Sequence, residues 1–142
     1  MQPVDCPFRT VIEIVESLRR EGVQAIIVDI HAEATSEKVA LGWYLDGLVS
    51  AVWGTHTHIQ TADERILPKG TAYISDVGMT GPYDSVIGRK VEQILTRFIV
   101  QVPTRFEVAE DNVHLCGAII DIDGQTGRAR SITRVNEPLV CA

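Results

Sequence analysis

The sequence predicts an α/β fold in a single domain over residues 1–142, with a βαβ unit followed by a mixed or antiparallel sheet. Two apolar, β-branched runs, Val23–Ile30 and Val49–Trp53, are typical of parallel strands buried on both faces. A helical pattern from Ser36 to about Leu45 lies between them, which gives the order strand, helix, strand. We expect a right-handed crossover, because nearly all such connections have that hand.

Capping and periodicity predict where the helices lie. Thr10 and Glu13 match a capping box, so we expect the first helix to begin at Thr10, and Gly22 suits the position after its end. Ser36 is expected to cap the second helix. A third helix is expected over Arg89–Val100, with these apolar residues on one face: Val91, Ile94, Leu95 and Phe98.

Short strands and turns are expected in the rest of the chain. Arg65–Leu67 and Thr71–Ser75 flank the turn signal Pro68-Lys69-Gly70 and are expected to be strands. The tail over Asn136–Ala142 is expected to fray. An antiparallel meander with a turn at Asp123–Gly127 is expected to contain three strands: Arg105–Ala109, Val113–Ile122 and Arg128–Val135.

Composition narrows the class of protein. Hydrophobic residues make up 45% of the 142 residues and charged residues 23%, which is typical of a globular domain. The formal net charge of −6, without a Lys/Arg cluster, argues against binding a nucleic-acid polymer. No apolar run reaches the ~20 residues that span a bilayer. The odd cysteine count, without C-x-x-C, favours inert thiols in a reducing cytoplasm rather than a disulfide framework: Cys6, Cys116 and Cys141.

Three histidines follow the two predicted parallel strands. His31 comes directly after the first, and His56 and His58 come after the second in Gly54-Thr55-His56-Thr57-His58, where Gly54 permits a tight backbone. Ligands collect at the carboxyl ends of strands in open α/β sheets, and imidazole is a common metal ligand. The sequence therefore predicts a metal site of these three histidines. Polar loop histidines, and a structural role for His31, are the alternatives.

Other polar residues near these strand ends are candidates for supporting roles. Asp29 is expected to be buried and to orient a ligand imidazole. Glu33 is expected to do the same or to be a solvated loop carboxylate. The Gly- and Pro-rich loop Asp76–Ser85 can line a substrate pocket, cover a phosphate with backbone amides, make a subunit contact or be a plain turn. His114 is expected to be structural. The candidate substrate-loop residues are Thr57, Gly78, Met79 and Thr80.

Three segments together resemble one protein family. Asp29–Lys38, Gly54–Asp63 and Asp76–Asp84 are similar to the YmdB-like bacterial metallophosphoesterases of the calcineurin-like superfamily. The resemblance runs from about Asp5 to Arg134. Ile30 departs from it, since the family usually has an aromatic residue there.

The resemblance implies a fold, a cofactor and a substrate class. The fold is a four-layer αββα sandwich, of which this chain would be the C-terminal half, a partial domain. His31 and His56 would ligate one divalent metal ion and His58 a second, with iron or manganese expected. In the complete enzyme a metal-bridging hydroxide attacks phosphorus while both ions hold the phosphate oxygens. The substrates are small phosphodiesters, including 2′,3′-cyclic nucleotides.

The same resemblance implies that essential groups lie elsewhere. The first half of the family supplies an aspartate, a Glu-Asn pair and an Asn-His pair, among them the bridging carboxylate and the leaving-group acid. We therefore assign no catalytic residue to this chain. One hypothesis is a metallophosphodiesterase that works with its N-terminal half. The other is a non-catalytic metal-binding or assembly module, or an inactive remnant, whose exposed sheet edge favours homo-oligomers.

Overall fold

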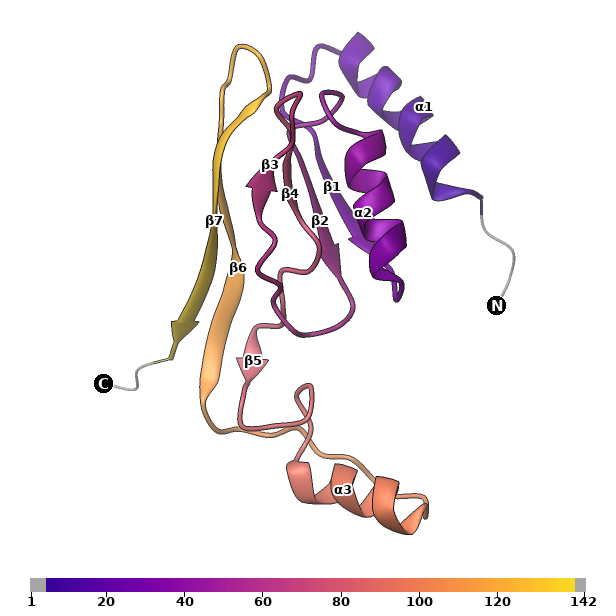
Figure 1. The fold of residues 1–142 in the computed structure, drawn as a ribbon, viewed down its shortest axis with the longest axis vertical. Coiled ribbons are helices and arrows are strands. Elements are labelled where there is room, and N and C mark those ends of the chain that lie inside the picture. Colours follow the sequence, from indigo (N-terminus) through magenta and orange to yellow (C-terminus); the bar gives the residue numbers. More distant parts are fainter. Residues whose placement is uncertain (1–4, 140–142) are drawn as a thin grey trace.

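The computed structural model describes residues 5–139. Figure 1 shows helices on one side of a sheet, and a second sheet that ends in a projecting arm. The elements in chain order are α1 (Pro7–Arg20), β1 (Ile27–His31), α2 (Thr35–Tyr44), β2 (Ala51–Thr55), β3 (Arg65–Ile66), β4 (Ala72–Ile74), β5 (Gly81–Pro82), α3 (Val91–Val100), β6 (Val113–Ile122) and β7 (Ala129–Pro138).

The first sheet has the strand order β1-β2-β4-β3. Strands β1 and β2 are parallel, with α2 between them in the chain, so the expected βαβ unit is confirmed. β2 and β4 are also parallel, and β3 pairs with β4 in the antiparallel sense. The register sets His31 opposite Thr55. The carboxyl ends of β1 and β2 therefore meet at one edge of the sheet.

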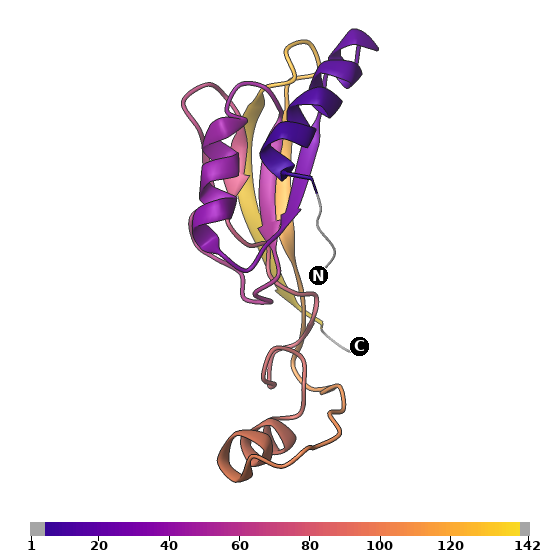
Figure 2. The same ribbon diagram turned by 90° about the vertical axis from the view of Figure 1, so that its right-hand side faces the viewer.

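Helices and the second sheet cover opposite faces of the first sheet. Val28 and Val52 face α1 and α2 and belong to the main core, together with Leu41. On the other face, Trp53 and the second-sheet residues Ile120 and Ile132 pack against a cluster of three buried alanines: Ala51, Ala72 and Ala129. That sheet is antiparallel with the order β5-β6-β7. Figure 1 shows the resulting three layers from right to left, which are helices, first sheet and second sheet, and in Figure 2 the two helices lie in front of the sheets.

Helix α3 stands apart from these layers, at the far end of β6 (Figures 1 and 2). The expected helix is confirmed, beginning at Val91 rather than Arg89, but most of its apolar face is exposed. Ile94 is buried, whereas Leu95 is exposed and Phe98 is 72% exposed. The apolar spacing predicts a helix correctly, but in the described part of the chain no second layer covers this one.

Both expected capping signals are wrong. Helix α1 begins at Pro7, with Cys6 before it and no side-chain cap. Proline suits the first helical turn because its fixed φ is helical and its missing N–H needs no partner there. Helix α2 begins at Thr35 after an extended Ala34, again without a side-chain cap. Each helix therefore begins before the residue that the capping rules indicate.

The first strand is shorter and more exposed than expected. β1 begins at Ile27 rather than Val23, because the Arg19 guanidinium takes the carbonyl oxygens of Val23 and Gln24 at 3.0 and 2.7 Å. The expectation of burial on both faces is also wrong, since Ile27 is 49% exposed. β1 is an edge strand, and the second sheet packs on β3 and β4 instead.

The meander also differs from expectation. Arg105–Ala109 is not a strand, because its backbone bonds the start of α3, with Lys90 N donating to Glu107 O at 3.1 Å. The short β5 pairs with β6 in its place. β7 continues through Pro138, so Asn136 does not fray but pairs with Cys116. Cys141 lies outside the described residues. No helix within residues 5–139 is long and apolar enough to cross a membrane.

Candidate functional site

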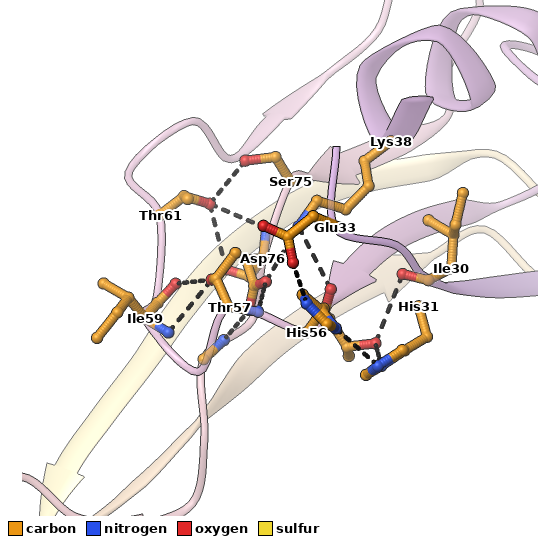
Figure 3. A network of polar contacts seen from close by, with 12 residues as sticks. Ile30, His31, Glu33, Lys38, His56, Thr57, Ile59, Thr61, Ser75 and Asp76 are labelled. Atoms are coloured by element: carbon orange, nitrogen blue, oxygen red, sulfur yellow. Dashed lines mark hydrogen bonds and ion pairs between the residues drawn. The ribbon is translucent and has the colours of Figure 1, made fainter. Parts of the chain in front are cut away.

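His31 and His56 meet at the carboxyl edge of the first sheet (Figure 3). His31 ends β1, and His56 follows Thr55 at the end of β2. Because these strands are parallel neighbours, their ends place the two imidazoles together. The distance from His31 Nε2 to His56 Nδ1 is 3.0 Å. The structure thus brings together two of the three histidines that the sequence singles out.

The remaining nitrogen of each imidazole contacts an oxygen atom. His56 Nε2 contacts a Glu33 carboxylate oxygen at 2.5 Å and donates its proton to it. His31 Nδ1 lies 3.1 Å from the Thr55 hydroxyl. That hydroxyl has one proton, and it donates this proton to the Asp29 carboxylate at 3.2 Å. Thr55 therefore accepts from His31 Nδ1.

These contacts leave two lone pairs facing each other. With protons on His31 Nδ1 and His56 Nε2, the facing atoms His31 Nε2 and His56 Nδ1 both carry lone pairs in the neutral rings. Such a contact is relieved by a cation, either an added proton on one of the two rings or a metal ion bound to both nitrogens. Two nitrogens at right angles around one metal, each at ~2.1 Å, would be about 3.0 Å apart. The pair therefore fits a shared metal ion.

His58 contacts a different segment. Its Nδ1 donates to the Ile87 carbonyl at 3.0 Å, which leaves Nε2 free of a proton in the neutral ring. Ligand histidines commonly donate their second nitrogen to an oxygen in this way. In residues 5–139, however, no group of three or more His, Cys, Asp or Glu side chains is arranged to hold a metal ion. Ligation by His58 stays a prediction.

The backbone of the histidine segment is strained. His56 has φ 111° and His58 has φ 66°, both in the region that favours glycine. Such conformations persist only where surrounding contacts fix them, and they cluster at functional sites. The strain turns the backbone after each residue, so the two side chains reach different partners.

The supporting carboxylates differ from expectation in one respect. Asp29 is exposed rather than buried, because no described residue covers that face of β1, and it reaches His31 only through Thr55. Glu33 contacts His56 directly. Both carboxylates are therefore exposed to solvent beside the histidine pair.

A buried ion pair contacts the backbone of the histidine segment from the interior of the protein, and the sequence analysis did not predict it. Lys38 Nζ is 3.1 Å from Asp76 Oδ2, and the side chains are 1% and 2% exposed. Burial raises the pKa of Asp76, but hydrogen bonds from the amides of Thr57 and Gly78 and from Lys38 outweigh it, so the pKa is lower than usual. A signal was available, since Lys38 shares a helix face with the core residue Leu41.

The candidate substrate loop lies partly against the histidine segment. The Met79 amide donates to the His58 carbonyl at 3.1 Å, and Gly78, with φ 78°, packs against Gln60. Thr57 donates its amide to Asp76 at 3.0 Å. Thr80 instead bonds the backbone of Cys116. Three of the four predicted loop residues are therefore close to His56 and His58 in the fold.

Gly54 has a different role from the one expected. It lies within β2 and has no positive φ, so it makes no tight turn. A Cβ at this position would be 1.9 Å from the Ser75 carbonyl oxygen and 2.6 Å from Lys38 Cδ. The glycine is needed because β2, β4 and Lys38 approach closely here.

His114 lies outside this site, near the buried thiol. Its ring nitrogens contact Asn136 Oδ1 at 2.6 Å and Asn112 Oδ1 at 2.9 Å. The Cys116 thiol is 2.7 Å from the Tyr83 hydroxyl, and burial and this contact raise the pKa of Tyr83 to about 12. Cys6, by contrast, is exposed.

Comparisons with known proteins agree on one family. The sequence model described as "YmdB-like protein" matches residues 1–135. The 2′,3′-cyclic-nucleotide 2′-phosphodiesterase of Bacillus subtilis is 56% identical over 135 residues, which cover 95% of this chain and 51% of that protein. The chain spans about half the length of the curated relatives it matches.

Two solved structures share the fold. The crystal structure of a hypothetical protein from Thermus thermophilus superposes with a TM-score of 0.87 at 44% identity, covering 97% of this chain and 53% of that one. The crystal structure of a novel phosphatase from Mycoplasma pneumoniae gives a TM-score of 0.82 at 41% identity, covering 93% of this chain and 47% of that one. Again about half of each relative is matched.

Proposed function

The chain belongs to the YmdB-like protein family, and from this we propose that it forms the C-terminal half of a metal-dependent phosphodiesterase. The observation that carries the proposal is the 3.0 Å distance between His31 Nε2 and His56 Nδ1, on two rings whose other nitrogens contact Thr55 and Glu33. It is supported by the Bacillus subtilis relative, whose name specifies 2′,3′-cyclic nucleotides. Small phosphodiesters of that kind are the proposed substrates.

Two divalent metal ions, iron or manganese, would supply Lewis acidity toward the phosphodiester. In this proposal His31 and His56 hold one ion and His58 holds the other. Glu33 and the Thr55–Asp29 relay fix the tautomers of the first two rings, so that each presents a lone pair. In the same proposal Thr57, Gly78 and Met79 border the phosphate, whereas Thr80 is held at the backbone of Cys116.

The uncovered surfaces support a larger sandwich. The outer face of β6 exposes two large apolar side chains, Leu115 at 56% and Ile119 at 67%. Ile27 is exposed on β1, beyond the reach of the second sheet. We propose that an N-terminal half supplies a helical layer over β6 and further strands beside β1. This would complete four layers, αββα.

The exposed edge strand also favours a second candidate function. β1 offers its free backbone edge for pairing, and such edges promote assembly. In that case the chain alone is a non-catalytic metal-binding or assembly module. Metal content separates the two candidates, since two tightly held ions per isolated chain would argue against a module with an incomplete site.

Reconstitution tests the phosphodiesterase proposal. The chain is mixed with a polypeptide comprising the part of the Bacillus subtilis relative that it does not match, and Mn²⁺ is added. Hydrolysis of 2′,3′-cyclic AMP and of bis(p-nitrophenyl) phosphate is expected, and EDTA should abolish it. His56→Ala and His58→Ala should each remove the activity, whereas His114→Ala should keep it. Full activity in either of the first two variants would overturn the site assignment.

A further inference from the structure

A buried ion pair holds the backbone on both sides of His56. The Lys38 ammonium donates to the Thr55 carbonyl at 3.3 Å, and the Asp76 carboxylate accepts from the Thr57 amide at 3.0 Å. Thr55 and Thr57 are the residues immediately before and after His56. We propose that Lys38 and Asp76 are positioning residues that fix His56 in its strained conformation and so aim its Nδ1 at His31.

The strain makes such a support necessary. A non-glycine residue at φ 111° would relax toward negative φ if its neighbours were free to rotate. Rotation about the bonds of His56 would move either the Thr55 carbonyl or the Thr57 amide. Each of these groups is held by one member of the ion pair, and Lys38 and Asp76 are bonded to each other at 3.1 Å.

Asp76 accepts hydrogen bonds from two backbone amides, and we assign it this role rather than that of a further metal ligand. Its Oδ2 accepts from Lys38 and Thr57, and its Oδ1 accepts from the Gly78 amide at 2.9 Å. The carboxylate is buried and hydrogen-bonded on both oxygens. It therefore links the histidine segment to the loop that begins at Gly78.

The burial of Lys38 supports its role as a positioning residue. Lysine is almost never fully buried unless it is paired, and here the ammonium is paired with a carboxylate, so the two add no net charge beside the histidines. The absence of a side chain at Gly54 makes room for the lysine, since a Cβ there would be 2.6 Å from Lys38 Cδ. Three residues from separate elements thus form the support.

The predicted effect on metal binding rests on the proposed function, whereas the predicted effect on the conformation of His56 does not. The geometric part is tested by NMR on the metal-free chain. The amides of Thr57 and Gly78 should exchange slowly with solvent, and the HN–Hα coupling of His56 should match a positive φ. In Asp76→Asn and Lys38→Met, Thr57 exchange should rise at least tenfold and the His56 coupling should change. Unprotected amides in the unaltered chain would overturn the inference without any variant.

The functional part is tested by Mn²⁺ titration calorimetry of the same proteins. Each single variant should weaken Mn²⁺ binding by about 10–100-fold, the range seen for groups that orient metal ligands. The double variant should be little worse than either single one, because both act through His56. Folded single variants that bind Mn²⁺ as tightly as the unaltered chain would overturn the inference.

Asp46→Asn provides a matched control. Asp46 is also a buried carboxylate that accepts backbone amides, from Lys69 and Thr71, but it lies before β2, at the opposite end of the sheet. It should lower the thermal stability without changing His56 coupling or Mn²⁺ affinity. If the control changed the coupling and the affinity as much as Asp76→Asn does, the specific link to His56 would be disproved. Absence of Mn²⁺ binding in the unaltered chain would contradict the metal site, while the NMR result would still decide the positioning role.

Discussion

His31 and His56 present unprotonated ring nitrogens to each other across 3.0 Å, although they are separated by 25 positions in the sequence. Neither ring can donate to the other in its neutral form, because the protons are directed at Thr55 and Glu33. A cation removes the repulsion between the two lone pairs. In the proposed function, a metal ion bound by both nitrogens would supply this cation.

Removing either imidazole should abolish tight metal binding. His31→Ala and His56→Ala should each weaken Mn²⁺ binding by more than about 100-fold, since loss of a supporting group alone costs about 10–100-fold. Calorimetric titration of the isolated chain measures the effect. His114→Ala is the control, because that ring is engaged by Asn112 and Asn136. Equal affinity in all three variants would mean that the metal binds elsewhere.

Loss of the Thr55 hydroxyl should weaken Mn²⁺ binding more than loss of the charge on Asp29, the carboxylate to which that hydroxyl donates. Thr55→Val keeps the shape but removes the acceptor that fixes the His31 tautomer, so Mn²⁺ affinity should fall by about tenfold. Asp29→Asn retains an acceptor for Thr55 at an exposed position and should cost less than Thr55→Val. ¹⁵N NMR of the His31 ring should show a changed tautomer ratio in Thr55→Val. A larger loss in Asp29→Asn would contradict the relay through Thr55.

The sequence was sufficient to predict where the two parallel strands lie, to within a few residues at each end, because the two apolar runs differ so clearly from their surroundings. It predicted β2, the βαβ order and two short strands at the positions of β3 and β4. Helix starts were less predictable. Several residues near each start can cap it, and Pro7 satisfies the first turn without any side-chain cap.

Contacts between residues far apart in the sequence determine the features of the fold and the site that could not be predicted. The Arg19 guanidinium shortens β1 by taking two carbonyls, and the Lys38–Asp76 pair joins residues 38 positions apart. A lysine on an apolar helix face indicates only that some partner exists. The orientation of His58 was also beyond the sequence, because its φ of 66° depends on contacts with the Met79 and Ile87 segments.

Gly54→Ala should disrupt the fold at the site. The added Cβ would be 1.9 Å from the Ser75 carbonyl oxygen, and backbone atoms cannot move away easily. The free energy of unfolding should fall by about 3 kcal/mol or more, as for severe overpacking. Gly117→Ala is the matched control, since nothing lies within 4 Å of a Cβ there. Urea unfolding measures both, and similar stabilities would refute the close approach of β2, β4 and Lys38.

Asp63 should contribute to stability at neutral pH and lose that contribution in acid. It accepts from the Thr61 hydroxyl at 2.7 Å and from the Ser75 amide at 3.0 Å. Burial raises its pKa, but these hydrogen bonds outweigh burial and hold the pKa below the ordinary 3.8. A carboxylate with a lowered folded-state pKa stabilises the fold above its unfolded pKa, and this stabilisation disappears as the pH falls through the folded value.

Thermal unfolding between pH 7 and pH 2 tests this link. Asp63→Asn should be less stable than the unaltered chain at pH 7. The difference should shrink as the pH falls below about 4, because the Asp63 carboxylate becomes protonated first in the unfolded chain and then, at lower pH, in the folded chain. Asp111→Asn, which changes an exposed carboxylate on the arm, should have little effect at pH 7. A difference between Asp63→Asn and the unaltered chain that stayed constant down to pH 2 would show that Asp63 acts through packing rather than through its charge. The hydrogen bonds to Thr61 and Ser75 fix the segment that follows His58, so the same carboxylate would also keep that histidine in place.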